Sequence, residues 1–143
     1  MHFELLFSVA STAAMAGWLA LILLPRWQAV IGLIRFGLIG ALSLTYAVLI
    51  FVYFFRVAGG GFGSIAEVRA LFMSDGVLVA GWIHYLAFDL FVGTWIAVEA
   101  DRRGYHRLLQ ALILAATFLF GPIGLLVFYL TRATDMALTF RKA

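Results

Sequence analysis

Residues 77–98 read VLVAGWIHYLAFDLFVGTWIAV, an apolar run that carries a histidine and an aspartate near its middle. In a helix, about 20 apolar residues cross the roughly 30 Å hydrocarbon core of a bilayer. An aspartate at that depth costs about 2.5–3.5 kcal/mol even on the scale obtained from insertion experiments. We therefore expect this segment to fold as a membrane helix, with His84 and Asp89 as its candidate functional residues.

The composition is that of a membrane protein rather than a soluble one. Of the 143 residues, 65% are hydrophobic and 12% are charged, whereas a soluble domain has about 45–50% and about 25%. The chain should form a single integral membrane domain over residues 1–143. Its net charge of +3 suits contact with the headgroups of membrane lipids, and no feature indicates nucleic-acid binding. The absence of cysteine excludes disulfides and thiolate metal sites.

Four apolar runs predict an all-α fold, a bundle of four transmembrane helices. Their approximate bounds are residues 5–24, 30–55, 77–98 and 108–130. Between the second and third runs, Ser64 is followed three residues later by Glu67, which is a capping-box signature for the start of a helix. Apolar residues then recur at helical spacing, so Ser64–Met73 should form a short amphipathic helix at the membrane surface.

An even number of spans places both termini on one side of the membrane. The first run has no basic residue before it and Arg26 after it, which favours an external N-terminus. It also lacks the basic start of a cleavable signal, so we expect it to be a retained helix. The total count of basic residues does not orient the bundle, because five fall on each side: Arg26, Arg35, Arg102, Arg103 and Arg107 against Arg56, Arg69, Arg132, Arg141 and Lys142.

Depth along the runs predicts which residues line a cavity together with the two candidates. The residues at the depth of His84 are Ser11, Thr12, Gly121 and Pro122, and the residue nearer the depth of Asp89 is Tyr46. Because proline removes a backbone donor and clashes with the preceding turn, the fourth run should kink at Pro122 beside this cavity. At the opposite rim, Arg35 should form a structural ion pair with Glu99 or Asp101.

His84 and Asp89 do not share a helix face, because five residues at about 100° each separate them by about 140°. Trp82 and Gly93 project to the same side as Asp89 and are candidate ligand-binding positions. No metal site is expected from the pair, and no HExxH spacing occurs. The pair either handles protons or orients a ligand in one apolar cavity, or it forms a hydrogen-bonded structural knot.

Two segments, GWIHYLAFDLFVGTW (residues 81–95) and HRLLQALILAATFLFGPIGLLVFYL (residues 106–130), carry a family resemblance. They resemble the abscisic-acid-deficient-four-like membrane proteins, whose plant members are required for neoxanthin formation. Plant members carry a plastid-targeting segment that is not seen here, which favours a bacterial homologue in the inner (cytoplasmic) membrane. The family's motif falls on Gly81, Trp82, His84, Asp89, Gly93, Gly121, Pro122 and Gly124.

The resemblance implies a protein of carotenoid or xanthophyll metabolism with a hydrophobic isoprenoid or carotenoid ligand. One hypothesis is a cofactor-free isomerase that converts an epoxide end group to an allenic alcohol, with His84 and Asp89 as its acid–base pair. The alternative is a non-catalytic pigment- or lipid-binding component that assists other enzymes. The sequence leaves the substrate and the oligomeric state open, a homo-oligomer included.

Overall fold

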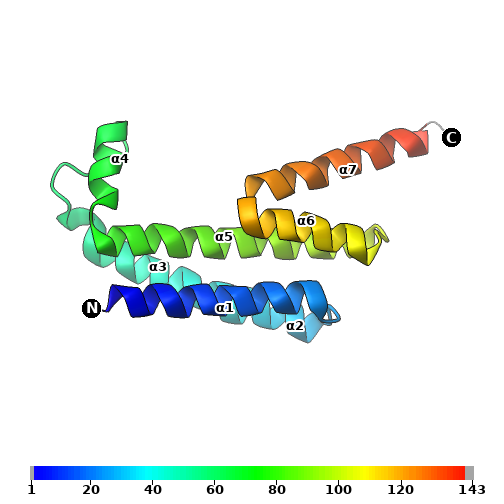
Figure 1. Ribbon diagram of the computed structural model, residues 1–143, viewed down its shortest axis with the longest axis horizontal. Coiled ribbons are helices and arrows are strands. Elements are labelled where there is room, and N and C mark those ends of the chain that lie inside the picture. The colour runs from blue at the N-terminus through cyan, green and yellow to red at the C-terminus, as the bar shows by residue number, and fades with distance from the viewer. Residues whose placement is uncertain (1, 141–143) are drawn as a thin grey trace.

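The structure is a computed structural model that describes residues 2–140, and side chains for residues 2–135. Within residues 2–140 every regular element is a helix, which confirms the expected all-α class (Figure 1). In chain order the elements are α1 (Phe3–Leu23), α2 (Gln28–Gly32), η1 (Leu33–Ile39), α3 (Gly40–Tyr53), η2 (Phe54–Arg56), α4 (Ile65–Phe72), α5 (Asp75–Arg102), α6 (Arg107–Phe120) and α7 (Pro122–Phe140).

Three helical stretches of the described chain are long and apolar enough to cross a membrane: Phe3–Leu23, Gln28–Arg56 and Asp75–Arg102. The second stretch joins α2, the π-helical η1, α3 and the short η2 end to end. α5 packs against both α1 and α3. Half of its apolar window (50%) is buried, against 28% and 11% for the other two stretches. α5 is therefore the most enclosed of the three.

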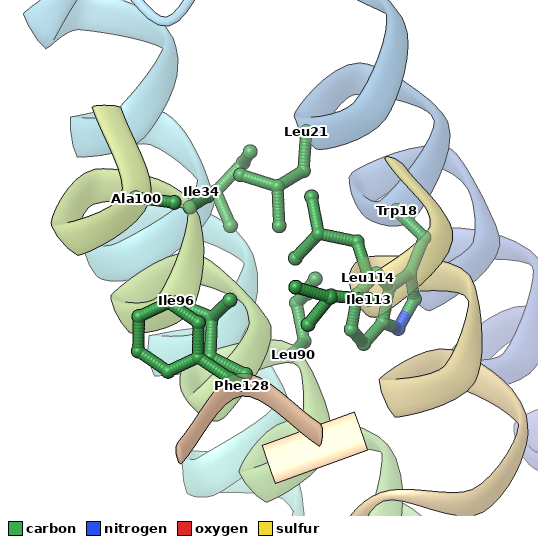
Figure 2. Close-up of a cluster of buried hydrophobic side chains, with 10 residues drawn as sticks. Trp18, Leu21, Ile34, Leu90, Ile96, Ala100, Ile113, Leu114 and Phe128 are labelled. Carbon is green, nitrogen blue, oxygen red and sulfur yellow. The ribbon is translucent and has the colours of Figure 1, made fainter. Parts of the chain in front are cut away.

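Two clusters of buried apolar side chains hold the helices together. One of them joins α1, α5, α6 and α7 around Trp18, Leu90, Leu114 and Phe128 (Figure 2). The Phe128 side chain has no exposed surface, so the first half of α7 is packed into this core. The other cluster joins α1, α3 and α5 around small side chains such as Ala14, which allow the backbones to approach closely.

The short helix α4 forms where the capping-box signature predicts it. The Ser64 hydroxyl oxygen accepts a hydrogen bond from the Glu67 backbone N–H at 3.2 Å. The Glu67 carboxylate reaches back to the backbone N–H of Gly63 at 2.9 Å. These two bonds satisfy backbone donors that the first turn of a helix leaves free. α4 then packs against α5, with Leu71 buried in the contact.

The fourth apolar run does not form the single spanning helix that the sequence predicts. α6 has 14 residues, a length of about 21 Å that is too short for a roughly 30 Å hydrocarbon core. The backbone reverses at Gly121, whose φ of +43° is a conformation that glycine adopts readily. Pro122 then occupies the first position of α7, where its missing N–H costs no helical hydrogen bond.

α7 runs back along α6 and α5 toward the end at which α6 begins (Figure 1). The Phe128 ring lies 5.5 Å from Trp95 and 6.4 Å from Tyr105, measured between ring centroids. Further along α7, the Tyr105 hydroxyl donates to the Asp135 carboxylate at 3.5 Å. α6 and α7 therefore form a helical hairpin with its tip near the middle of α5. The predicted kink at Pro122 is in fact a reversal of the chain.

Three spanning stretches followed by a returning hairpin should place the N-terminus and the end of α7 on opposite faces of the membrane. With this arrangement the basic residues no longer divide equally between the two faces of the membrane. Arg141 and Lys142 lie outside the described residues. Because cytoplasmic loops are enriched in basic residues, we expect the N-terminus outside. Among described residues, the α7 side has Arg26, Arg35, Arg102, Arg103, Arg107 and Arg132, whereas the N-terminal side has Arg56 and Arg69.

Single-cysteine labelling tests this topology, because the natural chain contains no cysteine. We expect Glu4→Cys and Asp135→Cys to react with a membrane-impermeant thiol reagent from opposite faces. Arg69→Cys, on α4, is the matched control and should react from the same face as Glu4→Cys. Labelling of Glu4→Cys and Asp135→Cys from one face would contradict the hairpin and restore the four-span bundle.

Candidate functional site

The Asp89 side chain lies halfway along α5 and faces a small cavity between α1, α5 and the end of α6. The cavity has a volume of about 240 Å³. Among the described residues that line it, Asp89 alone carries a carboxyl group. Its Oδ2 atom is buried and has no hydrogen-bond partner among the described residues. The lining residues are Ser11, Met15, Trp18, Trp82, Tyr85, Leu86, Asp89, Phe118 and Leu119.

The tip of the α6–α7 hairpin holds the Asp89 carboxyl in place. Gly121 is buried against it, and a Cβ atom at this position would lie 2.6 Å from Oδ1 of Asp89. The first turn of α7 starts at the same point, with Pro122 as its first residue. The hairpin tip therefore leaves no room for a side chain at position 121 beside the carboxyl.

The mouth of the Asp89 cavity is formed by an aromatic group from α5 and a hydroxyl from α1. The Trp82 indole N–H donates a hydrogen bond to the Ser11 hydroxyl oxygen at 2.9 Å. The Trp82 ring lies between Phe7 and Tyr85, with centroid distances of 5.3 and 5.4 Å. The structure thus brings four of the predicted site residues, Ser11, Trp82, Asp89 and Gly121, to one place.

Tyr85 belongs to this site, although sequence reasoning missed it. It lies one helical turn before Asp89 and lines the same cavity. Its hydroxyl donates to the backbone carbonyl of Phe118 at 3.3 Å, which ties α5 to the end of α6. The spacing of four residues from an intramembrane carboxylate was a signal that could have identified it.

His84 faces a different cavity, so the structure does not bring His84 and Asp89 together. The His84 cavity has a volume of about 280 Å³ and lies between α3, α4 and α5. Its ring stacks on Phe88 at 4.5 Å and lies 5.3 Å from Tyr46, measured between centroids. The side chain is exposed rather than buried. The cause is the 140° angle along α5, which turns the two side chains toward separate neighbours.

The remaining predicted ligand-binding residues lie outside the Asp89 cavity. Thr12 is exposed on α1, and Tyr46 lines the His84 cavity instead. Gly93 is buried where the Trp18 ring packs against α5, leaving no room for a side chain. Pro122 acts through the backbone, as the first residue after the reversal. These positions shape the bundle rather than contact the space beside Asp89.

The expected ion pair between Arg35 and Glu99 or Asp101 is not formed. Glu99 instead accepts a hydrogen bond from Arg103 at 2.9 Å, one helical turn away. Asp101 pairs with Arg26 at 2.8 Å. The Nε atom of Arg35 is buried and has no hydrogen-bond partner among the described residues. The sequence predicts the correct rim but the wrong arginine.

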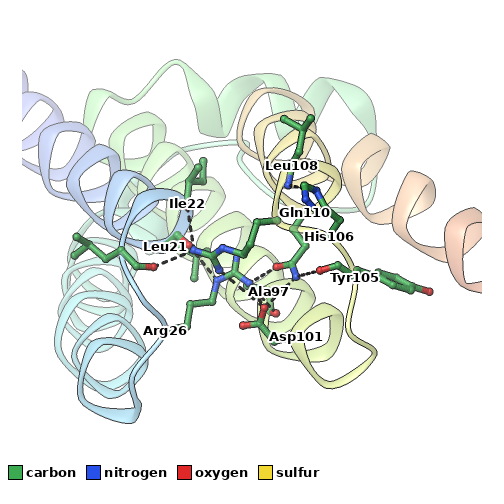
Figure 3. A network of polar contacts seen from close by, with 11 residues as sticks. Leu21, Ile22, Arg26, Ala97, Asp101, Tyr105, His106, Leu108 and Gln110 are labelled. Atoms are coloured by element: carbon green, nitrogen blue, oxygen red, sulfur yellow. Dashed lines mark hydrogen bonds and ion pairs between the residues drawn. The ribbon is translucent and has the colours of Figure 1, made fainter.

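Arg26 is the centre of a buried polar cluster that joins α1, α5 and α6 (Figure 3). Its side chain is 4% exposed. Besides Asp101, it donates to the backbone carbonyls of Leu21 at 3.2 Å and Ala97 at 3.1 Å, and to the side-chain carbonyl of Gln110. Burial lowers the pKa of the Arg26 guanidinium, whereas the hydrogen bond and charge of Asp101 act in the opposite direction.

Gln110 completes the cluster from α6. Its side chain is 1% exposed. It donates to the Asp101 carboxylate at 3.0 Å and to the backbone carbonyl of Tyr105 at 2.7 Å. Nearby, Arg107 donates to the carbonyls of Ile22 and Leu24 at the end of α1. The cluster thus satisfies several carbonyls that helix ends leave free, and its role is structural.

Within the described residues, no group of three or more His, Asp or Glu side chains could hold a metal ion. The Asp89 cavity combines this one carboxyl group with a lining made mostly of apolar and aromatic side chains. A carboxyl group in an apolar cavity favours a ligand that offers it a hydrogen bond.

Comparison with known proteins identifies a family. A family model described as ABA DEFICIENT 4-like (ABA4-like) matches residues 5–128. The matched region includes α1 to α6, the hairpin tip and all the residues that line the Asp89 cavity. No curated protein and no solved structure matches the chain.

Proposed function

Since the chain belongs to the ABA4-like family, we propose that it acts in xanthophyll metabolism and binds an oxygenated isoprenoid in the Asp89 cavity. Its apolar helices and its family together indicate a membrane protein. The observation that carries the proposal is the buried Oδ2 atom of Asp89, which has no partner among the described residues. An unsatisfied carboxyl oxygen in an apolar site costs about 1–3 kcal/mol or more. A ligand hydroxyl removes that cost by donating a hydrogen bond to Oδ2, and an epoxide oxygen removes it by accepting one from the protonated carboxyl.

The finer proposal is an isomerase that converts an epoxide end group to an allenic alcohol. In its protonated form, Asp89 donates its proton to the epoxide oxygen while the carbon–oxygen bond breaks. A proton then leaves a neighbouring carbon, and the electrons of that carbon–hydrogen bond form the new double bond. Reactant and product contain the same atoms, so the reaction is redox-neutral and returns one proton to the enzyme.

Asp89 serves as both acid and base in this scheme. One carboxyl oxygen gives the proton, and the carboxylate that remains takes up the proton released from carbon. No second titratable residue is required, which fits the position of His84 in another cavity. The rings of Trp82 and Tyr85 lie beside the carboxyl and provide flat apolar surfaces for the end group.

The second candidate function is binding without catalysis. It is favoured by the separation of His84 from Asp89, which leaves a single carboxyl group among the described residues of the cavity. In this case Asp89 and the Trp82–Ser11 mouth hold a pigment for another enzyme. The binding residues are the same, so turnover by the pure protein is what separates the two functions.

The test begins with the protein purified from carotenoid-producing cells, with bound pigment identified by absorption spectrum and mass spectrometry. The pure protein is then reconstituted in lipid nanodiscs with an epoxy-carotenoid, and the products are separated by chromatography. Formation of an allenic alcohol supports the isomerase, and bound pigment without conversion supports the binding component. If the protein retains no pigment and converts no epoxy-carotenoid, the proposed function is refuted.

A glycine substitution at the hairpin tip should weaken ligand binding by moving Asp89. Gly121→Ala adds a Cβ atom within 2.6 Å of the carboxyl and strains a backbone with φ of +43°. Gly104→Ala is the matched control, because its φ is +69° and nothing lies within 4 Å of the added atom. Both variants should lose about 1–2 kcal/mol of stability from the backbone.

Only Gly121→Ala should also lose bound pigment, on the order of tenfold in affinity, as measured by absorbance retained after size exclusion. Equal pigment retention in the two variants would show that Gly121 does not position the carboxyl.

A further inference from the structure

A second, larger cavity adjoins the Asp89 cavity on the same side of α5. Its volume is about 930 Å³, and it lies between the starts of α1 and α5 and the end of α4. Trp82 lines both cavities and forms the partition between them. The lining residues of the larger cavity are His2, Phe3, Glu4, Leu5, Phe7, Phe72, Asp75, Leu78, Val79, Gly81 and Trp82. We call it the outer cavity, and the one beside Asp89 the inner cavity.

The two cavities are consecutive sections of one groove between α1 and α5. On α5 most lining residues follow one helical stripe, 75, 78, 79, 82, 85, 86 and 89, and Gly81 lies at its edge toward the His84 cavity. On α1 most follow a stripe of residues 3, 4, 7, 11, 15 and 18, and Leu5 lies outside it. Spacings of three and four residues keep each stripe on one face of its helix. From Asp75 to Asp89 the groove is about 21 Å long, at 1.5 Å per residue.

The volumes of the two sections differ, and the difference limits which part of a ligand each section can hold. Ligand pockets for whole small molecules measure about 300–1,000 Å³. The inner cavity, at about 240 Å³, is below that range, whereas the outer cavity, at about 930 Å³, is near its upper limit. The inner cavity therefore has room for a ring end group but not for a long chain. A long chain attached to that ring has to pass Trp82 into the outer cavity.

Polar groups stand at both ends of the groove and apolar groups between them. Asp89 lies at the inner end, and Glu4 and Asp75 lie at the outer end, both exposed. The rings of Phe7 and Trp82 line the middle, 5.3 Å apart. This pattern matches a rod-shaped isoprenoid, whose long apolar part needs aromatic and aliphatic contacts.

We infer that the outer cavity is a second section of the same ligand site, so that the oxygenated ring of the isoprenoid lies beside Asp89 and its chain passes Trp82 into the outer cavity. This inference rests on the proposed function and adds the binding direction and the need for a long chain. Trp82 and Ser11 are the passage residues, since their hydrogen bond lies where the two sections meet and the ligand chain has to pass between or displace them.

Two tryptophan substitutions test the inference by narrowing one section at a time. Leu78→Trp narrows the outer cavity, and Met15→Trp narrows the inner one. Both residues are partly exposed, at 49% and 43%, so the larger side chain does not crowd the core. Leu44→Trp is the matched control, because Leu44 is 68% exposed and is not among the described residues that line either cavity.

The two probes are a full-length epoxy-carotenoid and its isolated ring fragment, an epoxy-ionone. Binding is measured as the rise in Tm that each probe gives to the protein in lipid nanodiscs. We expect Met15→Trp to weaken binding of both probes, and Leu78→Trp to weaken the long probe alone, each on the order of tenfold or more. Leu44→Trp should bind both probes as the parent does.

The outcomes separate this inference from the proposed function. If Leu78→Trp binds the long probe as the parent does while Met15→Trp loses both probes, the inner site stands and the groove is refuted. Loss of the ring fragment in Leu78→Trp would overturn the inferred direction of binding. If Met15→Trp changes the binding of neither probe, the Asp89 site itself is refuted.

Discussion

Asp89→Asn is expected to lower conversion of an epoxy-carotenoid by about 10²–10⁴-fold, the usual contribution of a general acid or base. The amide keeps the size of the carboxyl but has no acidic proton to give. The fold should be little affected, because the amide keeps an oxygen that can interact with Tyr85, and Oδ2 itself has no hydrogen-bond partner among the described residues. Turnover by the reconstituted protein and the melting temperature are the two measurements.

The matched control is His84→Gln, because His84 lies on the same helix but faces the cavity on the other side of α5. It should keep conversion and bound pigment near the parental level. If Asp89→Asn unfolds the protein, Asp89 is a structural residue. Equal loss of conversion in the two variants would mean that His84 and Asp89 act together, which would contradict their positions in separate cavities.

Bound pigment gives a separate measure of what Asp89 does. If Asp89→Asn retains pigment but does not convert the epoxy-carotenoid, Asp89 is the group that transfers the proton. Loss of pigment in Asp89→Asn, together with an inactive parent, indicates a binding component in which the carboxyl holds the end group. Pigment retention and conversion, measured for Asp89→Asn and for the parent protein, thus distinguish the two proposed functions.

The sequence predicts the features that depend on local pattern. The apolar run at 77–98 becomes part of α5, and Ser64 with Glu67 begins α4. Comparison of depth puts Ser11 and Gly121 at the level of His84, whereas in the structure both lie beside Asp89. These predictions use helical periodicity and the rise per residue, which change little between proteins.

The hairpin could not be predicted from the same information. Residues 108–130 are apolar enough for a span, and a proline kink and a full reversal have the same sequence pattern. What decides between them is the backbone conformation at Gly121 and the packing of Phe128 under Trp95. Both depend on tertiary contacts, so the fourth span is the part of the fold that sequence reasoning gets wrong.

For a related reason, the sequence predicts the wrong arginine, Arg35 instead of Arg26, for the ion pair with Asp101. Arg26 and Arg35 are close in sequence, and both lie near the rim that holds Glu99 and Asp101. Arg26 follows the end of α1, so its side chain can reach the end of α5 and the start of α6 at once. Its contacts with Ala97 and Gln110 join residues 71 and 84 positions apart, which helical periodicity does not address.

Arg26→Ala should destabilise the protein by about 1–3 kcal/mol or more, because it leaves buried hydrogen-bond acceptors without their donor, whereas the Asp101 carboxylate is 39% exposed and stays solvated. Gln110 is 1% exposed and would lose the donor to its side-chain carbonyl. The carbonyls of Leu21 and Ala97 would lose a donor as well. Thermal unfolding in detergent micelles, followed by circular dichroism, measures the change.

Arg103→Ala is the matched control, because it removes an arginine from an ion pair at the same rim. The Arg103 and Glu99 side chains are 27% and 21% exposed and one helical turn apart, an arrangement that contributes about 0.3–0.5 kcal/mol. Arg26→Lys should fall between the two, since a lysine keeps the charge but not the planar set of donors. Equal losses for Arg26→Ala and Arg103→Ala would contradict the buried cluster. The large difference we expect would show that Arg26 fixes α1 against α5 and α6, the three helices that enclose Asp89.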